Sequence, residues 1–178
     1  MKKLTSLMFL LVFVPVILQA NTTLYVLNTT ANYTLYFNTV SKAASCYPEI
    51  REYNPSGTSG YCILGAGGSI SFADFSQLST YYPGITISRK NSASATPTTI
   101  PVALANTYLT SLNMNWAYII YKVTNPGTGV TEGAWVGFSD FAGCHGLPDS
   151  WGTYGSTLTE SFTSFSIGSD RYFVAGEF

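Results

Sequence analysis

Charge is scarce in this chain: its 178 residues include eight Lys and Arg and nine Asp and Glu, which together make 10%. After residue 20 the only adjacent basic pair is Arg89-Lys90, whereas binding to nucleic acid depends on clustered Lys and Arg. The phosphate-binding pattern G-x-x-x-x-G-K-[ST] and the nucleophile elbow G-x-S-x-G are absent as well. We therefore predict no nucleic-acid partner and no cofactor.

Histidine is rarer still, because His145 is the only one, and cysteine occurs three times. A zinc site needs three or four nitrogen or sulfur ligands, and Cys144 with His145 would supply two. The ordered D-x-[DN]-x-[DN]-G loop that binds calcium is missing. The sequence therefore predicts no metal site.

Residues 1–20 have the layout of a secretory signal peptide. Two lysines precede an apolar run from Leu7 to Leu18. As a helix this run is about 18 Å long and is interrupted by Pro15, whereas about 20 apolar residues are needed to cross a bilayer. The short Met-Lys-Lys start is typical of a bacterial signal. We predict cleavage near Ala20, secretion to the periplasm or the extracellular space, and one folded domain over residues 21–178.

All three cysteines lie in the part predicted to be exported, where an oxidising compartment favours disulfides. Cys46 and Cys62 flank a segment that contains the turn sequence Asn-Pro-Ser-Gly. We predict a Cys46–Cys62 disulfide that contributes about 3 kcal/mol to stability. Cys144 is then left over, because the number of cysteines is odd.

Short segments in which apolar and polar residues alternate, separated by Gly, Pro, Asn and Ser, predict an all-β fold. Tyr33–Asn38 has the alternation of a strand with one buried face. Trp116–Val123 is apolar on both faces, so we predict a central strand in which Trp116, Tyr118 and Ile120 share one face. No long stretch has a helical period, and Asn91–Pro101 is predicted to be a surface loop.

The number and spacing of these segments favour a particular all-β architecture. About eight to ten short strands, with turn signals every ten to fifteen residues or so, are typical of a two-sheet antiparallel β-sandwich. A small closed β-barrel is the alternative. No segment recurs at a fixed period, which excludes a repeat architecture.

The segment Ser139–Tyr154 is the most unusual part of the chain, because it holds the only histidine, two carboxylates and a tryptophan. One hypothesis is a small extracellular hydrolase with Cys144 as nucleophile, His145 as base and Asp149 as the orienting group. Neighbouring residues in an extended segment point to opposite sides, which disfavours a Cys144–His145 pair. The structural alternative for Cys144 is a disulfide partner or a small buried side chain.

Asp140 and Asp149 allow two further hypotheses. A glycosidase uses two carboxyl groups held about 5 to 10 Å apart, and a calcium site would combine these carboxylates with backbone carbonyls. The sequence does not show the required proximity, and isolated acids in loops are usually solvated. Together with the scarcity of histidine, this favours a protein that is not an enzyme.

Aromatic residues are the more abundant signal. Trp135 and Tyr36 fall on the strand face opposite the predicted core, and Trp151 and Tyr154 fall in the unusual loop. Such rings stack on sugars or receive peptides, although they also pack inside sandwiches. We favour a secreted, non-enzymatic binding or surface-interaction module for a glycan, a protein or a cell-surface ligand. A membrane-active or pore-forming protein is a further alternative, because a tyrosine-rich, charge-poor surface suits a membrane interface.

Overall fold

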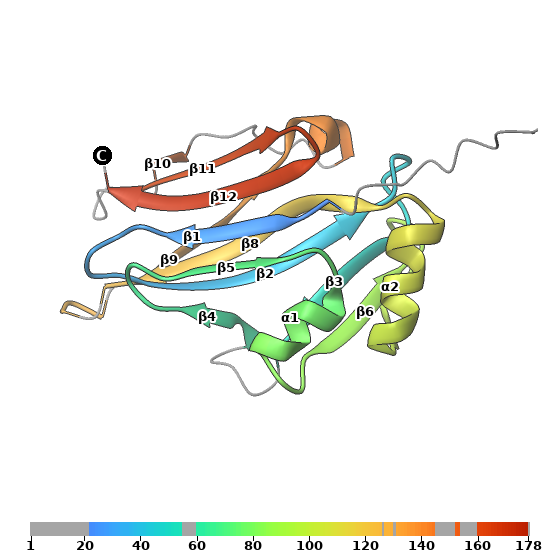
Figure 1. Ribbon diagram of the computed structural model, residues 1–178, viewed down its shortest axis with the longest axis horizontal. Coiled ribbons are helices and arrows are strands. Elements are labelled where there is room, and N and C mark those ends of the chain that lie inside the picture. Colours follow the sequence, from blue (N-terminus) through green and yellow to red (C-terminus); the bar gives the residue numbers. More distant parts are fainter. Residues whose placement is uncertain are drawn as a thin grey trace, which may run out of the picture.

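The structure is a computed structural model that describes residues 22–54, 60–125, 127–129, 131–144, 152–153 and 160–177. It is mostly strands, and two sheets pack face to face without closing into a barrel (Figure 1). The predicted all-β sandwich is therefore confirmed. The predicted signal peptide lies outside the described residues.

Two sheets make up the sandwich. The five-stranded sheet has the order β10 (Gly152–Thr153), β11 (Glu160–Ile167), β12 (Asp170–Glu177), β1 (Leu24–Asn28), β5 (Ser69–Phe72). The seven-stranded sheet has the order β7 (Thr98–Ile100), β6 (Thr86–Lys90), β3 (Glu49–Tyr53), β2 (Thr34–Lys42), β8 (Asn115–Thr124), β9 (Thr131–Gly137), with β4 (Cys62–Leu64) also paired to β2.

The described strand pairs are antiparallel apart from β1 and β12, which run parallel. Leu24 lies opposite Arg171 at one end of this pair, and Asn28 lies opposite Ala175 at the other. Segments almost 150 residues apart thus lie side by side in the middle of the five-stranded sheet.

Aromatic rings from both sheets fill the space between them. Trp116 of β8 meets Phe72 and Phe75 edge to face, with 5.2 Å between ring centroids in each pair. Farther along β8, Tyr121 stacks on Phe162 of β11 at 4.2 Å. Edge-to-face and stacked pairs add to the stabilisation that burial of apolar area provides. These contacts hold the two sheets together along the length of β8.

A bulge in the β2–β8 pair corrects the predicted faces of the central strand. Val40 lies opposite Tyr118 and the next residue of β2 lies opposite Trp116, so Ala117 is the extra residue. Trp116 therefore belongs to the core between the sheets, whereas Tyr118 faces outward with Ala117. The prediction that Trp116 and Tyr118 share a face is wrong, because an inserted residue shifts the two-residue alternation by one.

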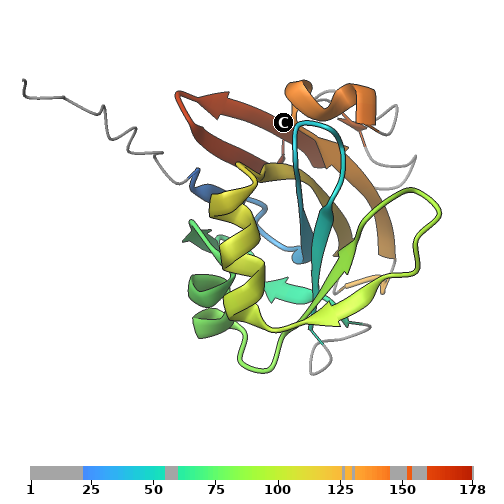
Figure 2. The same cartoon turned by 90° about the vertical axis from the view of Figure 1, so that its right-hand side faces the viewer.

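Two short helices lie together at one end of the sandwich (Figures 1 and 2), and the sequence pattern did not predict them. α1 (Phe75–Tyr81) begins at Asp74, whose side chain accepts the Gln77 N–H at 2.8 Å. α2 (Val102–Ser111) begins after Pro101 and buries only Ala105 completely. A helix with so little buried surface has a weak apolar period, which is why the pattern missed it.

The predicted surface loop Asn91–Pro101 is a loop only in its first part. Its second part forms β7, which pairs with β6. β7 is three residues long and lies at the edge of the seven-stranded sheet, so only one of its sides makes ladder hydrogen bonds.

One edge of β2 is shared by two strands, and a buried carboxylate fills the junction. β4 pairs with Leu35–Phe37 and β3 pairs with Val40–Lys42. Between them, Thr39 donates its backbone N–H and its hydroxyl, the latter at 2.6 Å, to the two carboxylate oxygens of Glu52. Glu52 is fully buried, and burial raises its pKa to about 7.

The stability of the fold should therefore decrease as the pH rises from about 4.5 to about 7. The pKa of Glu52 is higher in the folded chain than the ordinary value of 4.5, so the folded state binds the proton more tightly across this range. The corresponding loss is about 3 kcal/mol. Urea unfolding at a series of pH values measures it.

Glu52→Gln is the matched variant, because its amide can keep both contacts with Thr39 and does not titrate. The variant should lose the pH dependence between pH 4.5 and 7. Retention of the full wild-type slope in Glu52→Gln would assign the effect to other groups.

Candidate functional site

The outer face of the seven-stranded sheet carries two of the predicted binding residues. Trp135 of β9 lies opposite Ile120 of β8, and Tyr36 of β2 lies opposite Lys122 of β8. Tyr121, which lies between Ile120 and Lys122 in β8, belongs to the core. Trp135 is 44% exposed and Tyr36 is half-buried. The structure therefore places both on the side of the sheet that faces away from the sandwich interior.

A hollow of about 430 Å³ opens on this face beside Trp135. The described residues that line it come from β8, from β9 and from the position just before β4: Tyr61, Ile120, Tyr121, Lys122, Thr131, Gly133, Trp135. The Lys122 ammonium lies 4.7 Å from the centre of the Tyr61 ring. The hollow thus combines two aromatic side chains, an aliphatic floor, a hydroxyl and a cation, a mixture typical of ligand pockets.

Trp135 is the one predicted binding residue among the described residues of this hollow, whereas Tyr61, Lys122 and Thr131 were not predicted. Tyr61 directly precedes β4, which is only three residues long and too short to show an alternation. Tyr36 does not line the hollow, although it lies on the same face. The available signal was the high tyrosine content, which does not say which rings come together.

Trp135 also connects the hollow with a second apolar cluster. Its ring meets that of Tyr118 edge to face, with centroids 6.0 Å apart. Tyr118 is buried on the outer face with Val40, Ala117 and Phe141. Phe141 belongs to the 3₁₀ helix η2 (Ser139–Cys144), which covers this end of the sheet (Figure 2). The position of Trp135 is therefore supported by side chains that are themselves packed.

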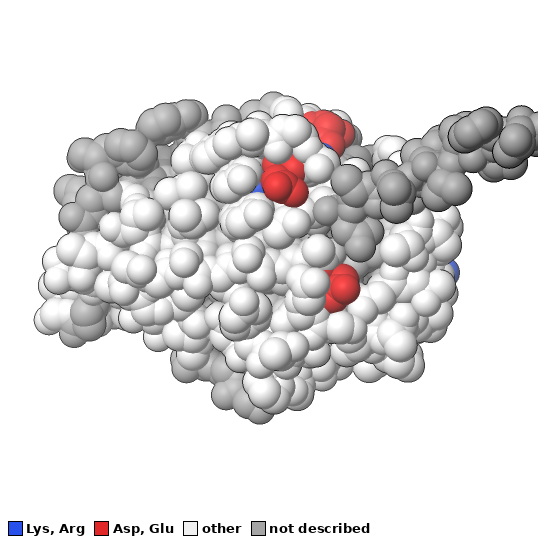
Figure 3. Space-filling model, viewed as in Figure 1, with Lys and Arg blue, Asp and Glu red and all other residues white. Residues whose placement is uncertain are grey.

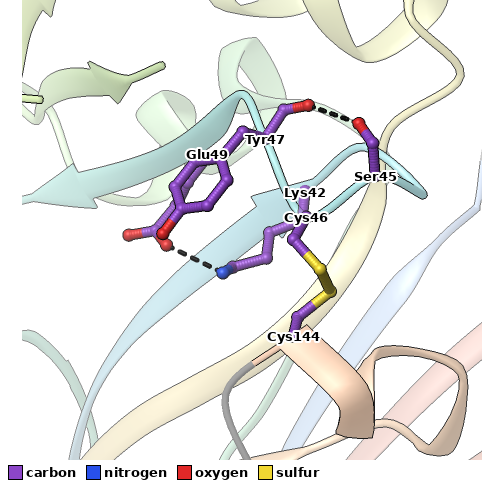
Figure 4. Close-up of a disulfide and its surroundings, with 6 residues drawn as sticks. All are labelled: Lys42, Ser45, Cys46, Tyr47, Glu49 and Cys144. Carbon is purple, nitrogen blue, oxygen red and sulfur yellow. Dashed lines mark hydrogen bonds and ion pairs between the residues drawn. A yellow bond between two sulfur atoms is a disulfide. The ribbon is translucent and has the colours of Figure 1, made fainter. Parts of the chain in front are cut away.

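A disulfide links η2 to the turn between β2 and β3. Cys46 is bonded to Cys144, with their Cα atoms 5.3 Å apart (Figure 4). The predicted Cys46–Cys62 disulfide is wrong. Cys62 is a free, buried cysteine whose side chain belongs to the core, paired in register with Phe37. Separation along the chain does not show that Cys62 points into the core between the sheets, whereas Cys46 lies in the turn between β2 and β3.

A buried lysine lies beside this disulfide (Figure 4). The Lys42 ammonium is 3.0 Å from the Glu49 carboxylate, and its side chain has no exposed surface. It also lies over the rings of Tyr47 and Tyr118, at 5.2 and 5.5 Å from their centres. Burial lowers the pKa of Lys42, and Glu49 opposes that effect. The ion pair is therefore a structural element under η2.

The hydrolase hypothesis loses its nucleophile in this structure, because the Cys144 sulfur is bonded to Cys46 and is not a thiolate. His145 and Asp149, its other two residues, lie outside the described residues, as do the predicted binding residues Trp151 and Tyr154.

Asp140, the acid of the Ser139–Tyr154 segment that the structure describes, is engaged by an arginine. Arg171 donates from Nη1 to Asp140 Oδ1 at 2.7 Å and from Nη2 to Asp140 Oδ2. This two-point contact joins η2 to β12. In the part of the chain that the structure describes, no three His, Cys, Asp or Glu side chains come close enough to hold a metal ion.

A second group of rings, the exposed Phe165 and the half-buried Tyr25 and Tyr172, lies on the outer face of the five-stranded sheet. Tyr172 stacks on Tyr25 at 4.6 Å and on Phe165 at 5.1 Å, with the ring planes within about 5° of parallel. The face seen in Figure 3 carries few charged residues. Because these rings stack on one another, the middle ring offers neither of its faces to a ligand.

Comparisons of the chain with protein-family models, with curated proteins and with solved structures gave no match. Among the described residues, no helix has the length and apolar character needed to cross a membrane.

The disulfide assignment predicts how each cysteine reacts. Alkylation of the native, unreduced protein followed by peptide mapping should give a linked Cys46–Cys144 peptide pair and an unmodified Cys62, which is alkylated only after unfolding. Burial and the nearby Glu52 charge raise the pKa of the Cys62 thiol, which lowers its reactivity further.

The same assignment predicts unequal effects on stability. Cys144→Ser removes a cross-link between residues 98 positions apart and should lower the free energy of unfolding by about 4 kcal/mol. Cys62→Ala should cost much less, because it leaves the cross-link in place. The reverse order of stabilities, or a bridged Cys62, would contradict the assignment.

Proposed function

We propose that this protein is a secreted, non-enzymatic binding module that takes a glycan in the hollow beside Trp135. The observation that carries the proposal is that Trp135 is 44% exposed at a hollow that is also lined by Tyr61. A flat aromatic ring exposed at a concave site is suited to stacking against the apolar face of a sugar. Lys122 and Thr131 add groups that can hydrogen bond to sugar hydroxyls.

The support beneath the hollow favours binding to a preformed site. Ile120, Lys122 and Trp135 project from the paired strands β8 and β9, and Trp135 rests against the buried Tyr118. A site on regular, packed strands loses little conformational freedom when it binds. The volume of about 430 Å³ falls in the range of small-ligand pockets and suits a short stretch of a glycan chain.

Secretion remains part of the proposal. The disulfide between Cys46 and Cys144 is compatible with an oxidising compartment outside the cytoplasm. The layout of residues 1–20 supports export by a cleaved signal peptide. N-terminal sequencing of the exported protein tests cleavage near Ala20.

Trp135→Ala tests the site. A glycan array with the labelled protein identifies a ligand, and titration calorimetry then compares variants. Trp135→Ala should weaken binding at least about tenfold, because loss of one stacked ring removes more than about 1.4 kcal/mol of binding free energy. Tyr81→Ala is the matched control, since Tyr81 is 55% exposed on α1, away from the hollow, and its loss should leave the affinity unchanged.

Two other ligand classes can be separated from a glycan by binding assays and by a liposome assay. Binding to a protein with no binding to any glycan would replace the glycan by a peptide ligand at the same rings. Dye release from liposomes would instead favour membrane activity, for which the exposed Phe165 and Ile167 of β11 would be the first residues to mutate. Equal glycan binding by wild type and Trp135→Ala would exclude the hollow as the site.

A further inference from the structure

Lys122 lies on the outer face of the seven-stranded sheet, near the end of β8 and one strand in from the edge strand β9. It lies on β8, opposite Tyr36 of β2 on one side and opposite Gly133 of β9 on the other. Both β-strand neighbours are uncharged. The side chain of Lys122 is half-buried and lines the hollow beside Trp135.

The absence of a side chain at Gly133 makes room for Lys122. A Cβ atom on residue 133 would come within 2.6 Å of Lys122 Cγ and 2.7 Å of the Tyr121 carbonyl oxygen. Contacts this short do not occur, so a larger residue would displace the lysine stem or the backbone. The pairing of a glycine with a lysine therefore lets the aliphatic stem lie close to β9 inside the hollow.

The charge of Lys122 is handled differently from that of two other cations in the described chain. Lys42 is paired with Glu49, and Arg171 is paired with Asp140. The Lys122 ammonium instead lies over the Tyr61 ring, and no carboxylate is among the described residues that line the hollow. A ring face orients an ammonium but does not neutralise it. The hollow therefore holds a positive charge between two aromatic walls.

We propose that the ligand of this hollow is an anionic sugar, whose negative group meets Lys122 while its apolar face meets Trp135. The proposal rests on the glycan-binding function proposed above and specifies its ligand class. Hydrogen bonds between an ammonium and an anion are stronger than those between neutral groups. The partly desolvated position of Lys122 reduces screening by solvent. The negative group can be a carboxylate, as in a uronic acid, or a sulfate ester.

Oligogalacturonic acid and its methyl ester are the matched probes, because they share one sugar backbone and differ in charge. A sulfated galactan oligosaccharide tests the second anion, and a neutral galactan oligosaccharide tests the uncharged backbone. Titration calorimetry gives the affinities. Chemical shifts of the Trp135 indole N–H, assigned with Trp135→Phe, report whether each probe reaches the hollow.

We expect one of the two anionic probes to bind at least about tenfold more tightly than its neutral counterpart and to shift the Trp135 signal. Lys122→Gln should remove this preference, and Lys122→Arg should keep most of it, since the charge remains. The preference should also decrease with rising salt concentration. Lys90→Gln on β6, a strand that does not contribute to the hollow, is the matched control and should bind like wild type.

The outcomes separate this inference from the function on which it rests. Equal or tighter binding of the neutral probes at Trp135 would overturn the anionic preference and leave the glycan-binding function intact. A preference that survives Lys122→Gln would overturn the role of Lys122. If no probe and no arrayed glycan binds, and the probes leave the unfolding temperature of the protein unchanged, both the anionic preference and the glycan-binding function are overturned.

Discussion

The pairing of β2 with β8 is the constraint on which both faces of the molecule depend. These are the two longest strands of the seven-stranded sheet and each is paired on both sides, and β8 carries core rings on one face and the floor of the hollow on the other. The bulge at Ala117 lets one strand serve both purposes, because it sends Trp116 inward and Tyr118 outward. Tyr118 then supports Trp135. The candidate site is thus a consequence of how the core is packed.

The sandwich and part of its candidate site could be predicted because they depend on local alternation. The outward position of Trp135 followed from the two-residue alternation of its strand, and the structure exposes this residue. The central position of β8 followed from apolar residues on both its faces. The faces of Trp116 and Tyr118 at its start could not be predicted, because a bulge depends on the partner strand and does not change the pattern of a single strand. The two helices were missed because they bury little surface.

Features that depend on distant segments were beyond reach of the sequence pattern. Cys46 meets Cys144 only because Phe141 of η2 packs against the outer face of the seven-stranded sheet, while Arg171 of β12 in the other sheet holds Asp140. Tyr61 reaches the hollow only because β4 and β3 share one edge of β2. Between these two pairings, the Glu52 carboxylate accepts the hydrogen bonds that Thr39 of β2 donates. Neither arrangement has a local period or a motif. Each depends on the packing of whole elements, which is set when the sheets assemble.

The parallel pair β1–β12 also determines how the domain responds to tension. The chain enters β1 at Leu24 and leaves β12 at Glu177, and these points lie at opposite ends of the pair. A pull between them slides the two strands along each other, so the hydrogen bonds of the pair must break together rather than one after another. A pull applied between the two ends of the domain would therefore meet more resistance at this pair than one that separated its hydrogen bonds in turn.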